Sequence, residues 1–158
     1  MFSPLLESII EREKIVVVNE STVDEFALQN GDVVLFFSGD HKRLVEVNDV
    51  AVILPELIKA SDNTLVAAVV DRDSERPLQR RYRFNSFPTL VFLRKGQYLG
   101  AISRVLDWAD YIAEINEILS SQPSQPPAFK LPDGCGTPAS TISQTTTKKL
   151  IEKGAENV

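Results

Sequence analysis

Two short apolar runs, at residues 32–38 and 64–71, constrain the fold of this chain more than any other feature. Neither run alternates apolar with polar residues, which is the pattern of strands that helices cover on both faces of a sheet. Segments with helical periodicity separate these runs from each other and from an earlier strand-like run at residues 14–18. Strands that alternate with helices pair in parallel through right-handed crossovers, so the sequence predicts an α/β domain.

The second half of the chain adds a hairpin and a last helix. Residues 86–102 form two strand-like runs joined by a tight turn at residues 95–96, which predicts an antiparallel pair at the end of the sheet. Trp108 then begins an apolar stripe at helical spacing that ends at Leu119, so we expect Trp108 in the core. The predicted fold is a central mixed sheet with a C-terminal antiparallel hairpin, flanked by helices.

The composition changes abruptly after Ser120. The remaining residues hold five of the nine prolines and are otherwise rich in Ser, Thr and Gln. A segment of this kind cannot bury enough apolar surface to offset the entropy that it loses on ordering. We therefore expect one domain at residues 1–120 and a flexible C-terminal tail at residues 121–158.

The charge distribution excludes some classes of partner. The chain carries a net charge of −5, and residues 1–70 hold 12 acidic and 5 basic side chains. Binding to nucleic acid needs a clustered basic face, so we expect a basic protein partner and no nucleic acid. No apolar run approaches the length of a membrane span, and the first residues lack the basic start of a secretory signal. These features predict a soluble cytoplasmic protein without membrane insertion.

Cysteine and histidine are too scarce for most metal or redox chemistry. Cys135 is the only cysteine and His41 the only histidine, so the monomer can form no internal disulfide and no Cys-based or multi-histidine metal site. We therefore expect no metal and no cofactor. Cys135 lies in a Gly/Pro segment far in sequence from any base, which favours an inert thiol over a mixed disulfide.

The order of these elements resembles a thioredoxin fold. Pro55 lies inside the helix that follows the central strand, and residues 80–97 resemble the thioredoxin segment in which an x-Pro-Thr motif opens the hairpin. The loop at residues 38–45 departs from that fold, because it carries charged side chains where a Cys-x-x-Cys pair is expected. Without a thiolate, dithiol–disulfide exchange is excluded on chemical grounds.

One family combines this fold with a loop that lacks cysteine. Three segments resemble the HyaE/HupG/HoxO group of NiFe-hydrogenase accessory proteins. They are SGDHKRLVEVNDVAVILPEL at residues 38–57, followed by FPTLVF and YLGAISRVLDWADYI. The Ser-x-Asp-x-Lys-Arg loop with its later Glu-Val-x-Asp is the most specific element of the resemblance. The resemblance implies a non-enzymatic chaperone for the hydrogenase small subunit precursor, which it would engage through the twin-arginine signal peptide before export.

The loop and the proline together define a candidate partner-binding site. In thioredoxin folds the proline at position 88 is cis, and the polar backbone beside it can pair with an extended peptide. The acidic side of the chain would attract a basic peptide segment, and an apolar groove near Phe87 would take its hydrophobic part. The candidate residues are Asp40, His41, Lys42, Arg43, Glu46, Asp49, Phe87, Pro88 and Thr89.

Other interpretations stay open at this point. Pro88 could only shape the turn into the hairpin, and the loop charges could only be solvated. The arginines at residues 80–83 favour a solvated helix face over a contact with another hydrogenase maturation factor. The chain could also be a thiol-dependent redox protein that acts through Cys135, or a structural thioredoxin-fold module that recognises folded protein within a maturation complex.

Overall fold

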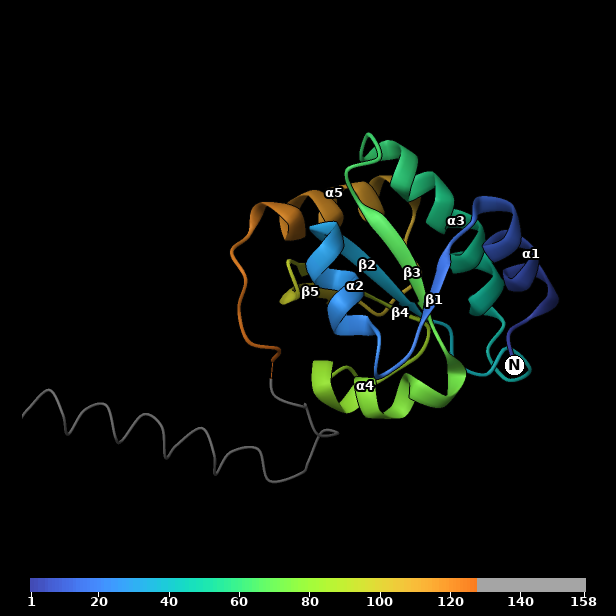
Figure 1. Cartoon of the computed structure of the whole chain (residues 1–158). Coiled ribbons are helices and arrows are strands. Elements are labelled where there is room, and N and C mark those ends of the chain that lie inside the picture. Colours follow the sequence, from blue (N-terminus) through green and yellow to red (C-terminus); the bar gives the residue numbers. More distant parts are fainter. Residues whose placement is uncertain (128–158) are drawn as a thin grey trace, which may run out of the picture. The chain divides into compact units, whose positions relative to one another are not determined.

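The structure is a computed structural model, and it describes residues 1–127 (Figure 1). Helices and strands follow one another along this part of the chain in the order expected from the apolar runs. They are α1 (Pro4–Glu13), β1 (Val16–Val18), α2 (Val23–Asn30), β2 (Asp32–Phe37), α3 (Glu46–Ala60), β3 (Val66–Val70), the short 3-10 helix η1 (Arg72–Ser74), α4 (Glu75–Tyr82), β4 (Thr89–Arg94), β5 (Gln97–Ile102) and α5 (Trp108–Ser120).

The strands form one mixed sheet in the order β1-β3-β2-β4-β5. Strands β1 and β2 pair with β3 in parallel, whereas β4 pairs antiparallel with both β2 and β5. The turn between β4 and β5 places Lys95 at a φ of 51° and Gly96 at a φ of 83°, as a two-residue hairpin turn of this hand requires. The predicted parallel core and the C-terminal antiparallel hairpin are both confirmed.

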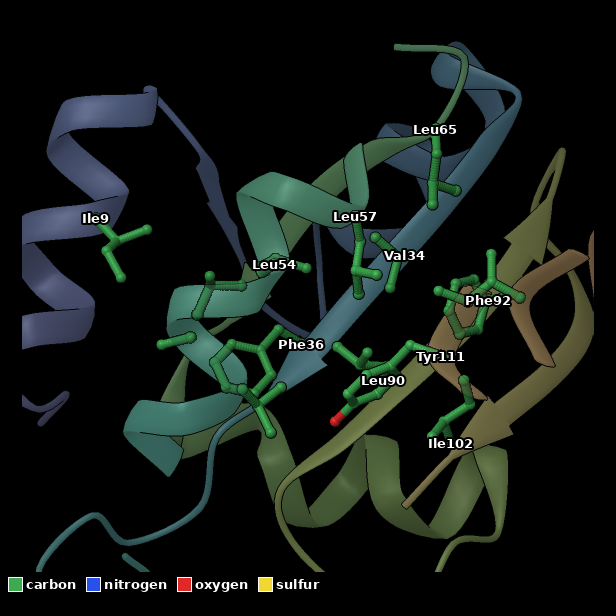
Figure 2. Close-up of a cluster of buried hydrophobic side chains, with 14 of the residues drawn as sticks. Ile9, Val34, Phe36, Leu54, Leu57, Leu65, Leu90, Phe92, Ile102 and Tyr111 are labelled. Atoms are coloured by element: carbon green, nitrogen blue, oxygen red, sulfur yellow. The ribbon is translucent and has the colours of Figure 1, made fainter. Parts of the chain in front are cut away.

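Helices cover both faces of this sheet and enclose two separate apolar clusters. Along β2, Val34 and Phe36 point into the cluster covered by α1, α3 and α5, part of which Figure 2 shows. Leu35 and Phe37 point to the opposite face, where α2 and α4 complete the second cluster. All four side chains are at most 1% exposed, which explains why the apolar run in β2 shows no alternation.

The ends of α1 and α2 show why the chain changes direction where it does. The Ser3 hydroxyl accepts the N–H of Leu6 (3.1 Å), and Pro4 occupies the first helical position, so α1 begins with a side-chain cap. At the end of α2, Gly31 takes a φ of 74°, which favours glycine, and the chain turns directly into β2.

Helix α5 corrects one prediction. Tyr111 and Ile115 are 0% and 5% exposed, whereas Trp108 is 46% exposed and lies outside the core. Tyr111, Ile115 and Ile118 form the stripe that packs on the sheet, while Trp108 and Ile112 belong to the neighbouring stripe that lies beside α3. The apolar spacing in the sequence fits both stripes, so it could not show which of them the sheet covers.

After α5 the chain runs along the edge of the sheet. The N–H of Ser124 donates to the carbonyl oxygen of Tyr98 in β5 (2.9 Å). The domain boundary and the flexible tail stay predictions, because the residues after 127, Cys135 among them, lie outside the described residues. Within the described part of the chain, no helix is both long enough and apolar enough to cross a membrane.

Candidate partner-binding site

The loop after β2 packs tightly against the segment that precedes β4. Gly39 has a φ of +76°, and a Cβ atom on it would lie 2.6 Å from the Cβ of Phe87, closer than two carbon atoms approach. Only glycine therefore allows this contact between the two segments. The carbonyl oxygen of Asp40 accepts the N–H groups of Arg43 and Leu44 (both 3.0 Å), which closes the loop as a turn. The loop that stands in the place of the redox cysteines thus has a defined backbone.

A buried carboxylate ties this loop to the start of α4. The side chain of Glu75 is 2% exposed, and its Oε2 accepts the N–H of Gly39 (3.0 Å) and lies 3.4 Å from the Ser38 hydroxyl. Its Oε1 is paired with the guanidinium of Arg72. Burial raises the pKa of Glu75, while the Gly39 N–H and Arg72 act in the opposite direction because they stabilise the carboxylate.

The sequence analysis missed the role of Glu75. An acidic residue in the first turn of a helix is typical of an exposed position that complements the helix dipole, and the arginines that follow favour a solvated helix. Periodicity is the signal that identifies it, because Glu75, Leu78 and Tyr82 stand at i, i+3 and i+7 and all three are buried. The arginines of this helix are exposed, as predicted.

The segment before β4 presents an aromatic ring and an unpaired piece of backbone. The Phe87–Pro88 bond is cis, as the thioredoxin resemblance predicts. The Phe87 ring packs edge-on against Phe84 (5.4 Å between centroids), and the Arg76 guanidinium lies 5.5 Å from its centroid. Within residues 1–127, the N–H and C=O of Phe87 form no hydrogen bond, so both are free to meet water or a partner.

Pro88 and Thr89 differ from the other predicted residues in being buried. The Thr89 hydroxyl donates to the carbonyl oxygen of Ser86 (2.6 Å) and lies 2.9 Å from the Ser103 hydroxyl. These side chains therefore shape the segment that carries Phe87, and a partner would reach the site through the backbone and ring of Phe87 itself.

A groove of about 540 Å³ opens between the loop after β2, the segment before β4 and the start of α4. We call it the arginine groove. Asp40, Arg43 and Phe87, three of the residues predicted to bind a partner, line it together. The structure thus brings these three residues to one surface, and their role in binding stays a prediction.

The walls of the arginine groove are charged, unlike the apolar groove predicted near Phe87. Arg72 and Arg76 also line it, and Leu44 and Phe87 are its only large apolar side chains. Arg72 pairs with a buried carboxylate, but among the described residues no carboxylate pairs with Arg43 or Arg76. Two guanidinium groups therefore face the groove without a fixed anionic partner.

The remaining predicted residues lie outside the lining of the arginine groove. His41 is half-buried and Lys42 exposed on the loop, while Glu46 and Asp49 are exposed in the first turn of α3. Burial raises the pKa of Tyr111, a hydrogen bond with the backbone of Leu106 acts in the opposite direction, and the charge of Asp49 raises it further. No group of three or more His, Cys, Asp or Glu residues within the described chain is arranged to hold a metal ion.

Comparison with known proteins decides the family. The family described as Hydrogenase-1 expression protein HyaE matches residues 5–111, which include every described strand and all three segments that form the arginine groove. The chain belongs to the HyaE family. The hydrogenase expression/formation protein HoxO of Azotobacter vinelandii is 45% identical over 114 residues, which cover 72% of this chain and 76% of that protein.

A further relative supports the HyaE assignment over most of the chain. HoxO of Cupriavidus necator is 35% identical over 131 residues, covering 82% of this chain and 81% of that protein. A solved structure of the hydrogenase expression/formation protein hupG from Rhodopseudomonas palustris CGA009 is 42% identical, covers 66% of this chain and 95% of that one, and has a TM-score of 0.48. This HyaE family member is therefore a hydrogenase expression/formation accessory protein with a thioredoxin-like α/β fold.

Proposed function

We propose that this HyaE family member is a non-enzymatic chaperone that binds the precursor of a hydrogenase small subunit, including its twin-arginine signal peptide. The observation that carries the proposal is the open arginine groove beside the free backbone of Phe87, where a thioredoxin-like fold holds extended chains. The named relatives are hydrogenase expression/formation proteins, which supports a hydrogenase polypeptide as the partner.

The arginine groove suits an extended polypeptide. The unpaired N–H and C=O of Phe87 can bond to the backbone of a partner chain, as a strand adds to the edge of a sheet. Arg43 and Arg76 offer donors for the partner's carbonyl oxygens, and Asp40 offers an acceptor for a partner arginine. The volume of the groove is about 540 Å³, which lies within the range of about 300–1,000 Å³ that is typical of ligand-binding pockets.

The acidic residues after the loop favour the basic part of a twin-arginine peptide. Glu46 and Asp49 are exposed at the start of α3, in the half of the chain with the acidic excess. His41 and Lys42 lie on the loop between Asp40 and Arg43, which both line the arginine groove. Attraction between exposed charges weakens once salt screens it, over about 10 Å at 0.1 M, so this part of the binding is salt-dependent.

The loop that replaces the redox pair holds no nucleophile for disulfide exchange. The loop holds no cysteine, and a thiolate is the nucleophile of disulfide exchange. The single thiol, Cys135, lies outside the described residues and outside the matched segment. A thiol-dependent function would require activity that disappears on Cys135→Ser, which gives a direct test of that alternative.

The proposal is tested by titrating the full chain with a small-subunit precursor and with the same subunit lacking its signal peptide. We expect tighter binding of the precursor, with an affinity that falls between about 0.02 M and about 0.3 M salt. The double variant Glu46→Gln/Asp49→Asn should bind the precursor about three- to tenfold more weakly. The matched control Glu7→Gln/Glu11→Gln, which removes two exposed charges on α1, should change affinity by less than about twofold.

The same titration separates the proposal from its alternatives. Equal affinity for the two forms of the subunit would favour a module that recognises folded protein instead of the signal peptide. Failure to bind either form, under conditions in which another chaperone of the subunit binds, would remove the proposal.

A further inference from the structure

A second groove, of about 310 Å³, lies between α3 and α5. We call it the helix groove. One wall is formed by Leu57 and Ala60 near the end of α3, and the other by Trp108, Ile112 and Leu119 of α5. Six of the eight lining residues are apolar and the other two, Ser61 and Asn116, are uncharged, in contrast to the charged arginine groove.

The exposure of Trp108 is the first sign that the helix groove receives a partner. It is the only tryptophan of the chain, and its side chain is 46% exposed beside the partly exposed Ile112. Val105, three residues earlier, is 44% exposed. An accessible tryptophan among other apolar side chains is typical of the centre of a protein–protein contact, where tryptophan supplies a large share of the binding free energy.

Negative charge lies at the Trp108 end of the helix groove, where α5 begins. Asp107 and Asp110 are exposed on either side of Trp108. Arg104 is the nearest base in sequence, and it is paired with a carboxylate further along α5. The end of the groove is therefore acidic.

Stabilisation of the helix dipole offers a simpler role for these acids. Carboxylates in the first turn of a helix interact favourably with its N-terminal dipole, typically by about 0.3–1 kcal/mol. This role accounts for Asp110, but it does not account for an accessible tryptophan and isoleucine beside it. A partner that fits the helix groove therefore needs both apolar side chains and basic residues.

We propose that the helix groove binds an apolar stretch of a partner polypeptide that is preceded by basic residues. The basic residues meet Asp107 and Asp110, and the apolar stretch lies along Trp108 and Ile112. The inference rests on the proposed function, and it places the apolar part of the signal peptide here instead of in the arginine groove. A second copy of this chain fits less well, because its own acidic end would meet a surface of the same sign.

The single tryptophan makes binding directly observable. The probe is a synthetic peptide with two arginines followed by a leucine-rich stretch, and its control carries glutamates in place of the arginines. We expect the arginine peptide to shift the emission of Trp108 to shorter wavelength and to protect it from acrylamide quenching, because the indole leaves water. The glutamate peptide should bind about tenfold more weakly, since its charges meet the acidic end.

Substitution locates the contact independently of fluorescence. With a labelled arginine peptide followed by anisotropy, Trp108→Ala should weaken binding about tenfold or more, and Trp108→Phe should weaken it less. The matched control is Leu28→Ala on α2, where a side chain that is 64% exposed lies on the opposite face of the sheet. It should change affinity by less than about twofold.

The possible outcomes separate this inference from the proposed function. If the arginine peptide and the small-subunit precursor both fail to bind the wild-type chain, both proposals are wrong. If they bind with unchanged Trp108 emission, and Trp108→Ala binds as tightly as wild type, only the helix groove is excluded. A peptide-free protein in which Trp108 is already shielded from acrylamide would also overturn the inference, because the chain itself or a second copy would then cover the groove.

Discussion

The arginine groove and the helix groove differ in how far the fold depends on their walls. The arginine groove is built around the buried pair of Glu75 and Arg72 and the glycine contact at Gly39, so its walls also hold two segments of the chain together. The helix groove is lined by Trp108 and Ile112, whose side chains stay partly exposed although neighbouring residues have packed α3 and α5 onto the sheet. One surface is a structural junction with charged walls, and the other is apolar surface that stays partly exposed above the core residues Leu57 and Ile115.

This difference indicates how a thioredoxin-like domain can lose its reaction and keep a binding surface. The backbone beside Phe87 is held in place by packing against Gly39, and Gly39 is held by Glu75, so none of this geometry requires sulfur. The charged walls nevertheless make the arginine groove a poor site for an apolar segment. The apolar surface lies instead between α3 and α5, so the two proposals place polar and apolar recognition at two separate sites.

The comparison predicts that changes in the arginine groove lower stability, whereas changes in the helix groove lower binding. The largest effect is expected for Glu75→Ala. It removes the acceptor of the Gly39 N–H and leaves Arg72 without its anionic partner, so the free energy of unfolding should fall by about 3 kcal/mol. Urea unfolding followed by circular dichroism measures this loss.

The control for this variant is Glu114→Ala, which breaks the more exposed pair between Glu114 and Arg104. Exposed pairs contribute about 0–1 kcal/mol, so the control should stay close to wild type. Equal losses for the two variants would contradict the structural role assigned to Glu75.

The next effect in size is expected for Gly39→Ala. The new Cβ would lie 2.6 Å from the Cβ of Phe87 in a backbone with positive φ, and the loss of stability should be about 2 kcal/mol. Gly31→Ala is the matched control, because Gly31 has nearly the same φ but no atom within 4 Å of the added Cβ. It should lose less than Gly39→Ala, because it carries the strain of a positive φ without the contact with Phe87. If the two variants unfold at the same urea concentration, the contact with Phe87 contributes nothing.

The backbone of this molecule could be predicted from sequence because each prediction used a local pattern. The unbroken apolar run of β2 predicts burial on both faces of the sheet, and the Lys95-Gly96 turn predicts a tight hairpin. Neither prediction needs knowledge of distant residues. Trp108 could not be placed in this way, since its stripe and that of Tyr111 have the same helical spacing.

The candidate site was predicted only as far as single segments allow. The loop and the proline segment each carry a recognisable pattern, so their meeting at one surface followed from the thioredoxin resemblance. The charge of the groove did not follow, because Arg43 comes from the loop after β2 whereas Arg72 and Arg76 come from η1 and α4, and the two segments meet only in the folded domain. The sequence near Phe87 suggested an apolar lining, and it is the tertiary arrangement that replaces it with guanidinium groups.

A smaller effect on stability is expected in the helix groove. Trp108→Ala should lower the free energy of unfolding by only about 1 kcal/mol, because nearly half of the side chain is already in water and no enclosed cavity is left. The same urea unfolding experiment measures it. A loss as large as that expected for a core aromatic residue, about 3–5 kcal/mol, would show that Trp108 is part of the fold and would remove the contrast between the two grooves.

The smallest effect is a pH dependence that only the arginine groove should show. Burial raises the pKa of Glu75 above its ordinary value of 4.5, so the folded protein holds this proton more tightly than the unfolded chain does. The stability that this group contributes is therefore fully present at low pH and is lost as the pH rises through the pKa of the folded state.

Lowering the pH from about 7 to about 5 should stabilise the wild type relative to Glu75→Gln, which lacks the titrating group. Urea unfolding of both proteins at the two pH values measures the difference, and the Trp108→Ala variant should follow the wild type. A difference that stays constant, or that changes in favour of Glu75→Gln at low pH, would show that the Gly39 N–H and Arg72 outweigh burial at this carboxylate.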